Sequence, residues 1–282
     1  MANYPLNLSK RKSQSKLNLK WVAKLLKHKW IDRLIPWLVP VSLILIWQFL
    51  VQIGWLSTRV LPSPTSVVDA GVKLASSGEL LRHVSVSAGR ALAGFAIGGG
   101  IGFALGLLNG ISSISEKLLD TSVQMLRNIP HLAMIPLVIL WFGIGEEAKL
   151  FLVSIGVLFP IYLNTFHGIR TVDPGLIEMG KVYGLKPFSL FWQIILPGAL
   201  PSILVGVRFA LGLMWLTLIV AETIASDSGI GYMAMNAREF MQTDVVVFSI
   251  LLYALLGKLA DSIARQLEAW SLQWHPNYQT SK

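Results

Sequence analysis

Charged side chains interrupt several of the long apolar runs in this sequence, and they are the residues with the clearest capacity for chemistry. Arg90, Arg127 and Arg208 lie within or at the edges of such runs, and Glu222 follows Arg208. A charge in a bilayer costs at least ~2.5 kcal/mol, so each should face a partner or an aqueous cavity. Arg127 and Arg208, at comparable depth, would attract an oxyanion. The alternative, which we prefer for each arginine singly, is an interhelical ion pair or carbonyl contact.

Other residues near these charges are candidates for the same path. A lone histidine such as His131 is more often a hydrogen-bonded packing residue than a ligand, and Trp215 suits a core or membrane interface. Glu222 is about 21 Å along a helix from Arg208, so it cannot neutralise that charge within one helix. The candidate anion path comprises Arg127, Asn128, His131, Arg208, Trp215 and Glu222.

The composition identifies the surroundings of these residues as a membrane. Hydrophobic residues make up 54% of the chain and charged residues 14%, with a mean hydropathy of +0.60. Soluble domains carry about 25% charged residues, so we expect a polytopic membrane protein. The net charge of +9 is concentrated in residues 1–34, which indicates a membrane-surface and topology signal rather than nucleic-acid binding. The absence of cysteine excludes disulfides and thiolate metal sites.

The hydropathy pattern predicts an all-α bundle of six transmembrane helices preceded by an amphipathic interfacial helix over residues 17–34. Lys and Arg concentrate on one side of this layout, which places both termini in the cytoplasm. The expected spans are residues 34–53, 90–108, 119–142, 150–166, 201–223 and 245–263. The expected domains are a basic tail with the interfacial helix (1–34), a first span (35–53), a periplasmic connection (54–88), a core (89–264) containing a loop at 173–197, and a cytoplasmic tail (265–282).

Proline and glycine refine several of these segments. The connection at 55–88 should contain a short helix from Pro64 to Leu74 and a turn near Gly78. We expect the third span to be a single kinked helix, the fourth to be broken by Pro160, and residues 224–243 to form an outer loop.

Glycines recur every fourth residue in the second span. Such overlapping small-residue repeats leave a bare backbone stripe along one helix face, which lets a neighbouring helix approach closely. We therefore assign the stripe to helix packing in preference to ligand lining. Its members are Gly94, Gly98, Gly102 and Gly106, and Gly110 continues the spacing.

A polar island between two apolar runs, residues 173–197, predicts a pair of short surface helices. The first runs from Pro174 to Tyr183 and ends at Gly184, which can adopt a positive φ without a steric penalty. The second runs from Pro187 to Ile195. Such a pair suits a groove on another protein, and the predicted apolar contacts are Ile177, Met179, Val182 and Leu185.

This island also resembles a phosphate-binding loop, but incompletely. Residues 175–181 match most of that motif, yet Val182 stands where a Ser or Thr would hold magnesium, and no strand precedes it. We reject nucleotide binding at this position.

The island instead resembles the cytoplasmic coupling loop of permease subunits in binding-protein-dependent ABC importers. Glu178, Gly184 and the closing Ile-x-Leu-Pro fall at the family spacing, while Met179 and Gly180 replace family alanines. The resemblance assigns ATPase coupling to Glu178, Met179, Gly180, Gly184, Leu185, Ile194, Leu196 and Pro197.

Over residues 35–276 the chain is similar to aliphatic sulfonate importer permeases. The runs that carry this likeness are 124–131, 135–143, 159–164, 206–215 and 236–240. Taurine, nitrate and bicarbonate permeases share the architecture, but Arg127 and Asn128 before Pro130 favour sulfonate.

The resemblance implies a type I importer in the bacterial inner membrane. It would contain two copies of this chain, two ATPase subunits that bind ATP and Mg²⁺, and a periplasmic binding protein. The chain itself would bind no cofactor and would not be an enzyme. A secondary anion transporter, which would need inverted repeats and intramembrane carboxylates, and a membrane scaffold are the alternatives.

Overall fold

The computed structural model describes residues 29–224 and 226–274, and these ranges are helical nearly throughout, with no strand. Helices α2 (Lys29–Gln52), α4 (Glu79–Ile111), α8 (Glu146–Arg170) and α13 (Thr243–Ser271) are long and apolar enough to cross a membrane, as is the continuous segment Pro187–Ile224. A bent helix pair adds a sixth candidate if counted as one span. The predicted all-α membrane bundle is thus confirmed. Most of the basic tail and of the interfacial helix lies outside the described residues.

The chain forms two compact units, residues 1–66 and residues 67–282. In the first unit, α2 remains helical through Pro36 and Pro40. The amide of Thr65, at the start of α3 (Pro64–Ser77), donates to Gln48 Oε1 of α2 over 3.4 Å.

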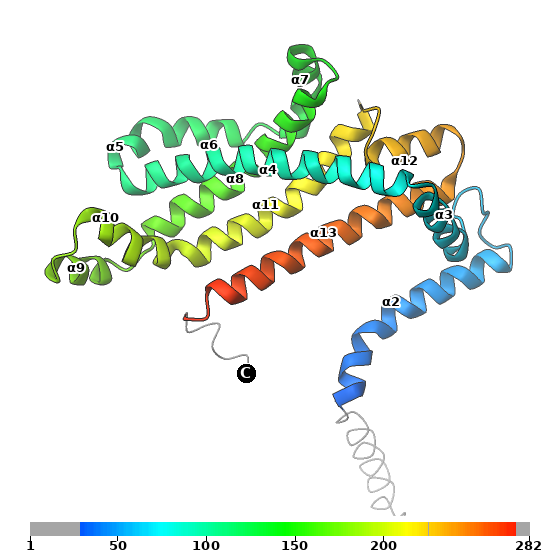
Figure 1. Cartoon of the computed structure of the whole chain (residues 1–282), viewed down its shortest axis with the longest axis horizontal. Coiled ribbons are helices and arrows are strands. Elements are labelled where there is room, and N and C mark those ends of the chain that lie inside the picture. Colours follow the sequence, from blue (N-terminus) through cyan, green and yellow to red (C-terminus); the bar gives the residue numbers. More distant parts are fainter. Residues whose placement is uncertain (1–28, 225, 275–282) are drawn as a thin grey trace, which may run out of the picture. The chain divides into compact units, whose positions relative to one another are not determined.

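In the second unit, α4 packs along α8, α8 packs along α11 (Leu196–Ile224), and α11 contacts both α12 (Ile230–Glu239) and α13. Figure 1 shows these helices running side by side, with α12 at one end and α9 (Pro174–Val182) and α10 (Pro187–Leu190) at the other. We call these the α12 end and the α9 end. Every candidate residue discussed below belongs to this second unit.

The predicted connection at 55–88 is mostly helical. Gly78, with φ +82°, makes the predicted turn, but α4 begins directly after it at Glu79, eleven residues before the expected start of the second span. The extension occurs because residues 79–89 contain neither proline nor a run of turn-forming residues. Residues 224–243 likewise contain α12 where a loop was expected, so that expectation was wrong.

The glycine stripe is the contact surface between α4 and α8. A Cβ atom at Gly98 or Gly102 would collide with the backbone carbonyl of Ser154 or Leu158. At Gly106 it would lie 2.7 Å from a carbonyl oxygen of α8, again too close. At Gly94 it would meet the Val153 side chain. Bare backbone therefore lets these two helices approach more closely than any side chain would allow.

The third predicted span is not a single kinked helix. Residues 113–127 form a helical segment made of α5 (Ser113–Ser115), the π-helical turn η1 (Glu116–Asp120) and α6 (Thr121–Arg127). After a break, η2 (His131–Met134) and α7 (Ile135–Phe142) continue at an angle of 79°. Pro130 has no N–H and disfavours helical backbone at the residue before it, which ends α6.

Pro160 does not break the fourth span, contrary to the prediction. Helix α8 is continuous from Glu146 to Arg170, with Pro160 buried inside it. The packing of α4 and α11 against α8 holds the helix together where one backbone hydrogen bond is lost. Asn164 Nδ2 also donates to the Pro160 carbonyl over 2.9 Å.

The polar island folds as two helices joined at Gly184, as predicted. Asp173 caps α9 by accepting from the Gly175 amide over 2.8 Å, and Gly184 adopts φ +77°. The second helix does not stop near Ile195. Instead α10, the π-helical turn η3 (Phe191–Ile195) and α11 form one continuous segment, Pro187–Ile224, which we call the α10–α11 rod. The helix that contains the expected fifth span therefore begins before Pro201.

The α4–α8 contact predicts a large difference between two glycine substitutions on one helix. Gly98→Ala should destabilise the protein by about 1–3 kcal/mol, because a methyl group there overlaps the Ser154 carbonyl. Gly100→Ala is the matched control, since a Cβ at Gly100 meets nothing within 4 Å. Thermal unfolding in detergent should show a lower Tm for Gly98→Ala only. Equal Tm values for both variants would contradict the packing role.

Candidate functional site

Glu222 of α11 is the centre of a buried hydrogen-bond network at the α12 end. It is 1% exposed, and its carboxylate accepts hydrogen bonds from Arg90 Nη1 (2.8 Å), Ser87 Oγ (2.8 Å), Tyr253 Oη (2.9 Å) and the Gly231 amide (2.9 Å). These donors come from α4, α12 and α13, so the carboxylate joins four helices. A buried carboxylate requires such donors to offset its lost hydration.

Arg90 of α4 extends this network to α8 and to the loop before α12. It is 5% exposed, and its Nε and Nη2 donate to Glu146 over 2.6 and 2.5 Å. Nη1 also donates to the Ser228 carbonyl over 2.6 Å. Lys149 pairs with Glu146 at 3.0 Å, so two cations face two carboxylates. All three guanidinium nitrogens have protein acceptors, which favours a structural role for Arg90.

Two glycines let the backbone come close to Glu222. Gly229 has φ +110°, and a Cβ there would collide with the Glu222 carboxylate. A Cβ at Gly231 would lie 2.5 Å from Glu222 Cβ. Glycine at these two positions therefore lets the start of α12 pack directly against the Glu222 side chain.

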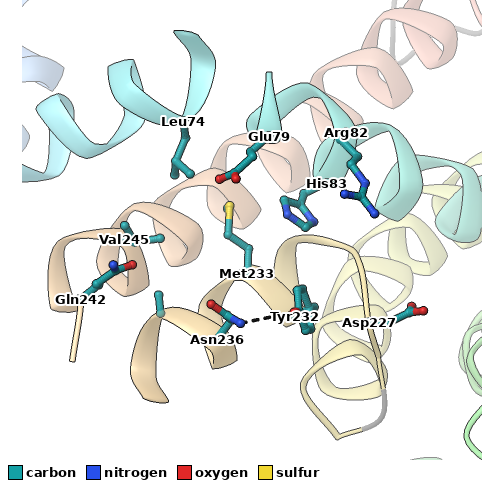
Figure 2. Close-up of a pocket in the computed structure, with 11 residues that line it drawn as sticks. Leu74, Glu79, Arg82, His83, Asp227, Tyr232, Met233, Asn236, Gln242 and Val245 are labelled. Atoms are coloured by element: carbon teal, nitrogen blue, oxygen red, sulfur yellow. Dashed lines mark hydrogen bonds between the residues drawn. The ribbon is translucent and has the colours of Figure 1, made fainter. Parts of the chain in front are cut away.

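A pocket of about 380 Å³ adjoins the network at the α12 end, and Figure 2 shows the side chains around it. His83 is 9% exposed, and its Nδ1 accepts from the Gly229 amide over 3.1 Å. Both charge signs line the pocket, Arg82 against Glu79 and Asp227. It therefore lacks the positive excess that would hold a simple anion. No group of three His, Asp or Glu able to hold a metal occurs among the described residues.

The two arginines of the predicted anion path do not share a partner. Arg208 Nε donates to Asp261 of α13 over 2.7 Å, and its Nη1 lies 4.0 Å from Glu268. Arg127 is exposed on α6 and has no ion-pair partner within the described ranges. Arg208 thus forms the interhelical ion pair that the alternative interpretation expects, and Glu222 belongs to a different network.

The remaining predicted path residues lie in different surroundings. His131 is half-buried, and its Nε2 is 3.2 Å from Thr217 Oγ1 of α11. Trp215 is half-buried with its ring edge-on to Tyr253 at 6.2 Å, and its indole N–H is buried without a partner in the described chain. Asn128 is exposed at the break after α6. The structure does not gather these side chains into one site.

The α9 end presents an apolar surface formed by α9, α10 and η3, which we call the coupling patch. Its residues are exposed to between 47% and 85%, although most are large and hydrophobic. Contiguous exposed apolar patches are typical of interaction sites, so this surface is a candidate for one. Glu178 lies exposed in the same helix, α9. The coupling patch consists of Met179, Val182, Tyr183, Phe188 and Trp192.

The other residues of the predicted coupling loop point inward and hold its shape. Gly180 is buried, and a Cβ there would meet the side chains of Ile194 and Leu190. The Leu185 amide donates to the Gly180 carbonyl over 3.0 Å, which closes the turn at Gly184. Leu185, Leu196 and Pro197 are half-buried. Ile177, expected as a contact residue, instead packs against the core cluster around Ile169, Val172, Ala199 and Ile203.

Sequence reasoning missed Ser87, Glu146 and Tyr253 as partners of the buried charges. Ser87 lies three residues before Arg90, on the same helix face, and this spacing was an available signal. Glu146 lies between the expected third and fourth spans, and Tyr253 lies in an apolar run, so neither position indicated a buried partner. Their convergence depends on which helices neighbour each other.

Known transport proteins match most of the length of this chain. The profile of the family described as binding-protein-dependent transport system inner membrane component matches residues 96–271. The putative aliphatic sulfonates transport permease protein SsuC of Escherichia coli (strain K12) is 64% identical over 250 residues, covering 89% of this chain and 95% of the relative.

Two further relatives cover similar shares. The protein of the same name in Bacillus subtilis (strain 168) is 46% identical, covering 90% of this chain and 91% of the relative. The taurine transport system permease protein TauC of Escherichia coli (strain K12) is 30% identical, covering 92% of this chain and 100% of the relative.

The buried network predicts a strong effect of one neutralised carboxylate. Glu222→Gln should destabilise the protein by about 3–5 kcal/mol, because it leaves the Arg90 charge partly uncompensated inside the bundle. Glu79→Gln, which changes an exposed carboxylate on α4, is the control and should be neutral. Denaturation in detergent measures both. The Arg90→Met and Glu222→Met double variant should lose less than the sum of its single variants, and strict additivity would argue against the pair.

Proposed function

The chain belongs to the family of binding-protein-dependent transport system inner membrane components, and on that premise we propose that it forms the transmembrane path of an ATP-driven importer of aliphatic sulfonates. The observation that carries the substrate is the 64% identity to an aliphatic sulfonates permease, against 30% to a taurine permease over a similar share of the chain. The chain is a multi-pass membrane subunit and not itself an enzyme.

A separate subunit supplies the ATPase activity in this proposal. Residues 175–181, which resemble a phosphate-binding loop in sequence, lie inside helix α9. Their backbone is committed to a helix rather than to a loop that could surround phosphate groups. The partners are therefore an ATPase dimer, which binds ATP and Mg²⁺, an extracytoplasmic binding protein that delivers the anion, and a second copy of this chain.

The coupling patch is the surface for the ATPase. Exposed apolar side chains on a short helix pair fit a groove on a soluble partner, and Glu178 beside them adds a charged contact. This assignment places the α9 end in the cytoplasm, and the basic residues concentrated in segment 1–34 favour the same side for the termini. The α12 end then faces the binding protein.

The α10–α11 rod transmits movement between these two ends. Phe188 and Trp192 of the coupling patch and Glu222 of the buried network are parts of this one continuous helical segment. When the ATPase dimer closes, it would move the coupling patch, and the rod would carry that displacement to Glu222. The bundle would thereby switch from inward-open to outward-open.

The anion path in this proposal depends on cations that the bundle does not neutralise. Arg90 is excluded because its nitrogens already donate to protein acceptors. Arg127 and Arg208 remain candidates, with Asn128, His131 and Trp215 near the path. Arg208 is 40% exposed despite its pair with Asp261.

The substrate assignment predicts a ranked uptake panel. Membrane vesicles containing this chain with its cognate ATPase and binding protein should take up alkanesulfonates in an ATP-dependent manner, and taurine, nitrate and bicarbonate at least about tenfold more slowly, equivalent to about 1.4 kcal/mol of discrimination. Radiolabelled uptake measures this ranking. Preference for taurine, nitrate or bicarbonate would replace the sulfonate assignment, and uptake without ATP would indicate a secondary transporter.

The coupling patch predicts loss of ATPase binding when a charge is introduced. Val182→Asp should uncouple transport and reduce co-purification of the ATPase by about tenfold or more, because an unpaired carboxylate would be buried at the interface. Gly184→Val should act similarly, since φ +77° is strained for a β-branched residue. Phe240→Asp, on a residue 68% exposed at the α12 end, is the matched control. Full transport in Val182→Asp and Gly184→Val would refute this docking surface.

A further inference from the structure

Helix α13 carries charged residues along one face of its second half, at a spacing that aligns them. Lys258, Asp261, Arg265 and Glu268 are separated by three, four and three residues, so they form one stripe on the helix. The opposite face carries large apolar side chains that are 48–65% exposed. The apolar face consists of Leu255, Leu259, Ile263 and Leu267. The two faces thus suit two different environments, hydrocarbon on one side and water on the other.

Three cations in this region share a single carboxylate. Asp261 lies 2.7 Å from Arg208 Nε, 2.6 Å from Arg265 Nη2 and 3.8 Å from Lys258 Nζ. Glu268 is the second nearby carboxylate, and it lies 4.0 Å from Arg208 Nη1. The cluster therefore contains three positive and two negative charges and has a net charge of +1.

The cations keep hydrogen-bond donors that the described chain does not use. Arg208 donates only through Nε, although a guanidinium carries five N–H groups. The Lys258 ammonium makes no hydrogen bond within the described ranges, and its side chain is 66% exposed. The Arg265 side chain is 54% exposed. Within the described chain these donors have no acceptor, so they are available to water or to a bound anion.

The charge of Lys258 makes hydrocarbon an unfavourable environment for this part of α13. It lies about halfway along the 29-residue helix α13, which at 1.5 Å per residue is about 44 Å long. An exposed ammonium near the middle of a membrane-spanning helix is costly unless it faces a polar cavity. An aqueous space beside the stripe would avoid this cost when the protein is in the membrane.

We propose that Arg208, Lys258 and Arg265 form a weak oxyanion-binding station on the water-filled side of α13, positioned by Asp261. This proposal rests on the proposed function. It specifies which residues along the path bind the sulfonate oxygens. Guanidinium and ammonium donors suit a tetrahedral oxyanion head with several acceptors. Asp261 and Glu268 together reduce the net charge to +1, which keeps binding weak enough for the anion to leave again.

The absence of cysteine from the chain makes the aqueous face directly testable. Lys258→Cys places a thiol on the charged stripe, and Leu259→Cys places one about 100° further round α13, on the apolar face. The assembled complex in membrane vesicles is treated with a water-soluble anionic methanethiosulfonate, which reacts with thiolate and therefore needs a hydrated site. We expect Lys258→Cys to react at least about tenfold faster than Leu259→Cys, and saturating hexanesulfonate to slow that reaction. Equal rates, as for a stripe covered by lipid or by a second copy, would overturn the proposal.

Uptake measurements test the charge itself. Lys258→Gln should lower ATP-dependent hexanesulfonate uptake by about tenfold, the effect of losing one charge-assisted hydrogen bond, while Lys258→Arg retains most of it. Lys73→Gln, an exposed lysine of α3, is the control. If the unsubstituted complex imports no sulfonate, the proposed function fails, whereas thiol reactivity still tests the aqueous face. If it imports sulfonate and Lys258→Gln does so equally fast, the station is wrong.

Discussion

The burial of the Glu222 carboxylate constrains the whole α12 end of the bundle. A carboxylate with 1% exposure is tolerated only while its donors remain in place, and those donors come from α4, α12 and α13. Arg90 then brings α8 into the same network through Glu146. Any movement of α11 along its axis must therefore keep these contacts or exchange them together. In our proposal, this coupling favours discrete arrangements of the bundle over gradual ones.

Helices α4 and α8 are packed more tightly than α13, and this difference affects which parts of the bundle can move. Between α4 and α8, glycines bring backbone against backbone, so the pair behaves as a rigid block. Helix α13, in contrast, has few buried residues and a charged stripe with many unused donors. In our proposal, α4 and α8 keep their relative positions, and the anion and the partner subunits act on the less tightly packed surfaces such as that of α13.

Local chemistry made much of this fold predictable from sequence. The spacing from Gly94 to Gly106 indicated a close helix contact, and Gly184 indicated a turn with positive φ, because both features depend on residues near one another in the chain. The location of the breaks was harder to predict, since the packing of α4 and α11 keeps α8 intact at Pro160, whereas the segment around Pro130 bends by 79°. The partners of Arg90 and Arg208 were not predictable, because they are set by which helices become neighbours.

The continuity of the α10–α11 rod limits which insertions and deletions the sequence can accept during evolution. Each residue added to or removed from an α-helix rotates everything beyond it by about 100°. A single insertion between Trp192 and Glu222 would turn the Glu222 carboxylate away from Arg90 while leaving the coupling patch unchanged. We expect substitutions on the exposed faces of the rod to be tolerated more readily than insertions or deletions between Ile195 and Glu222.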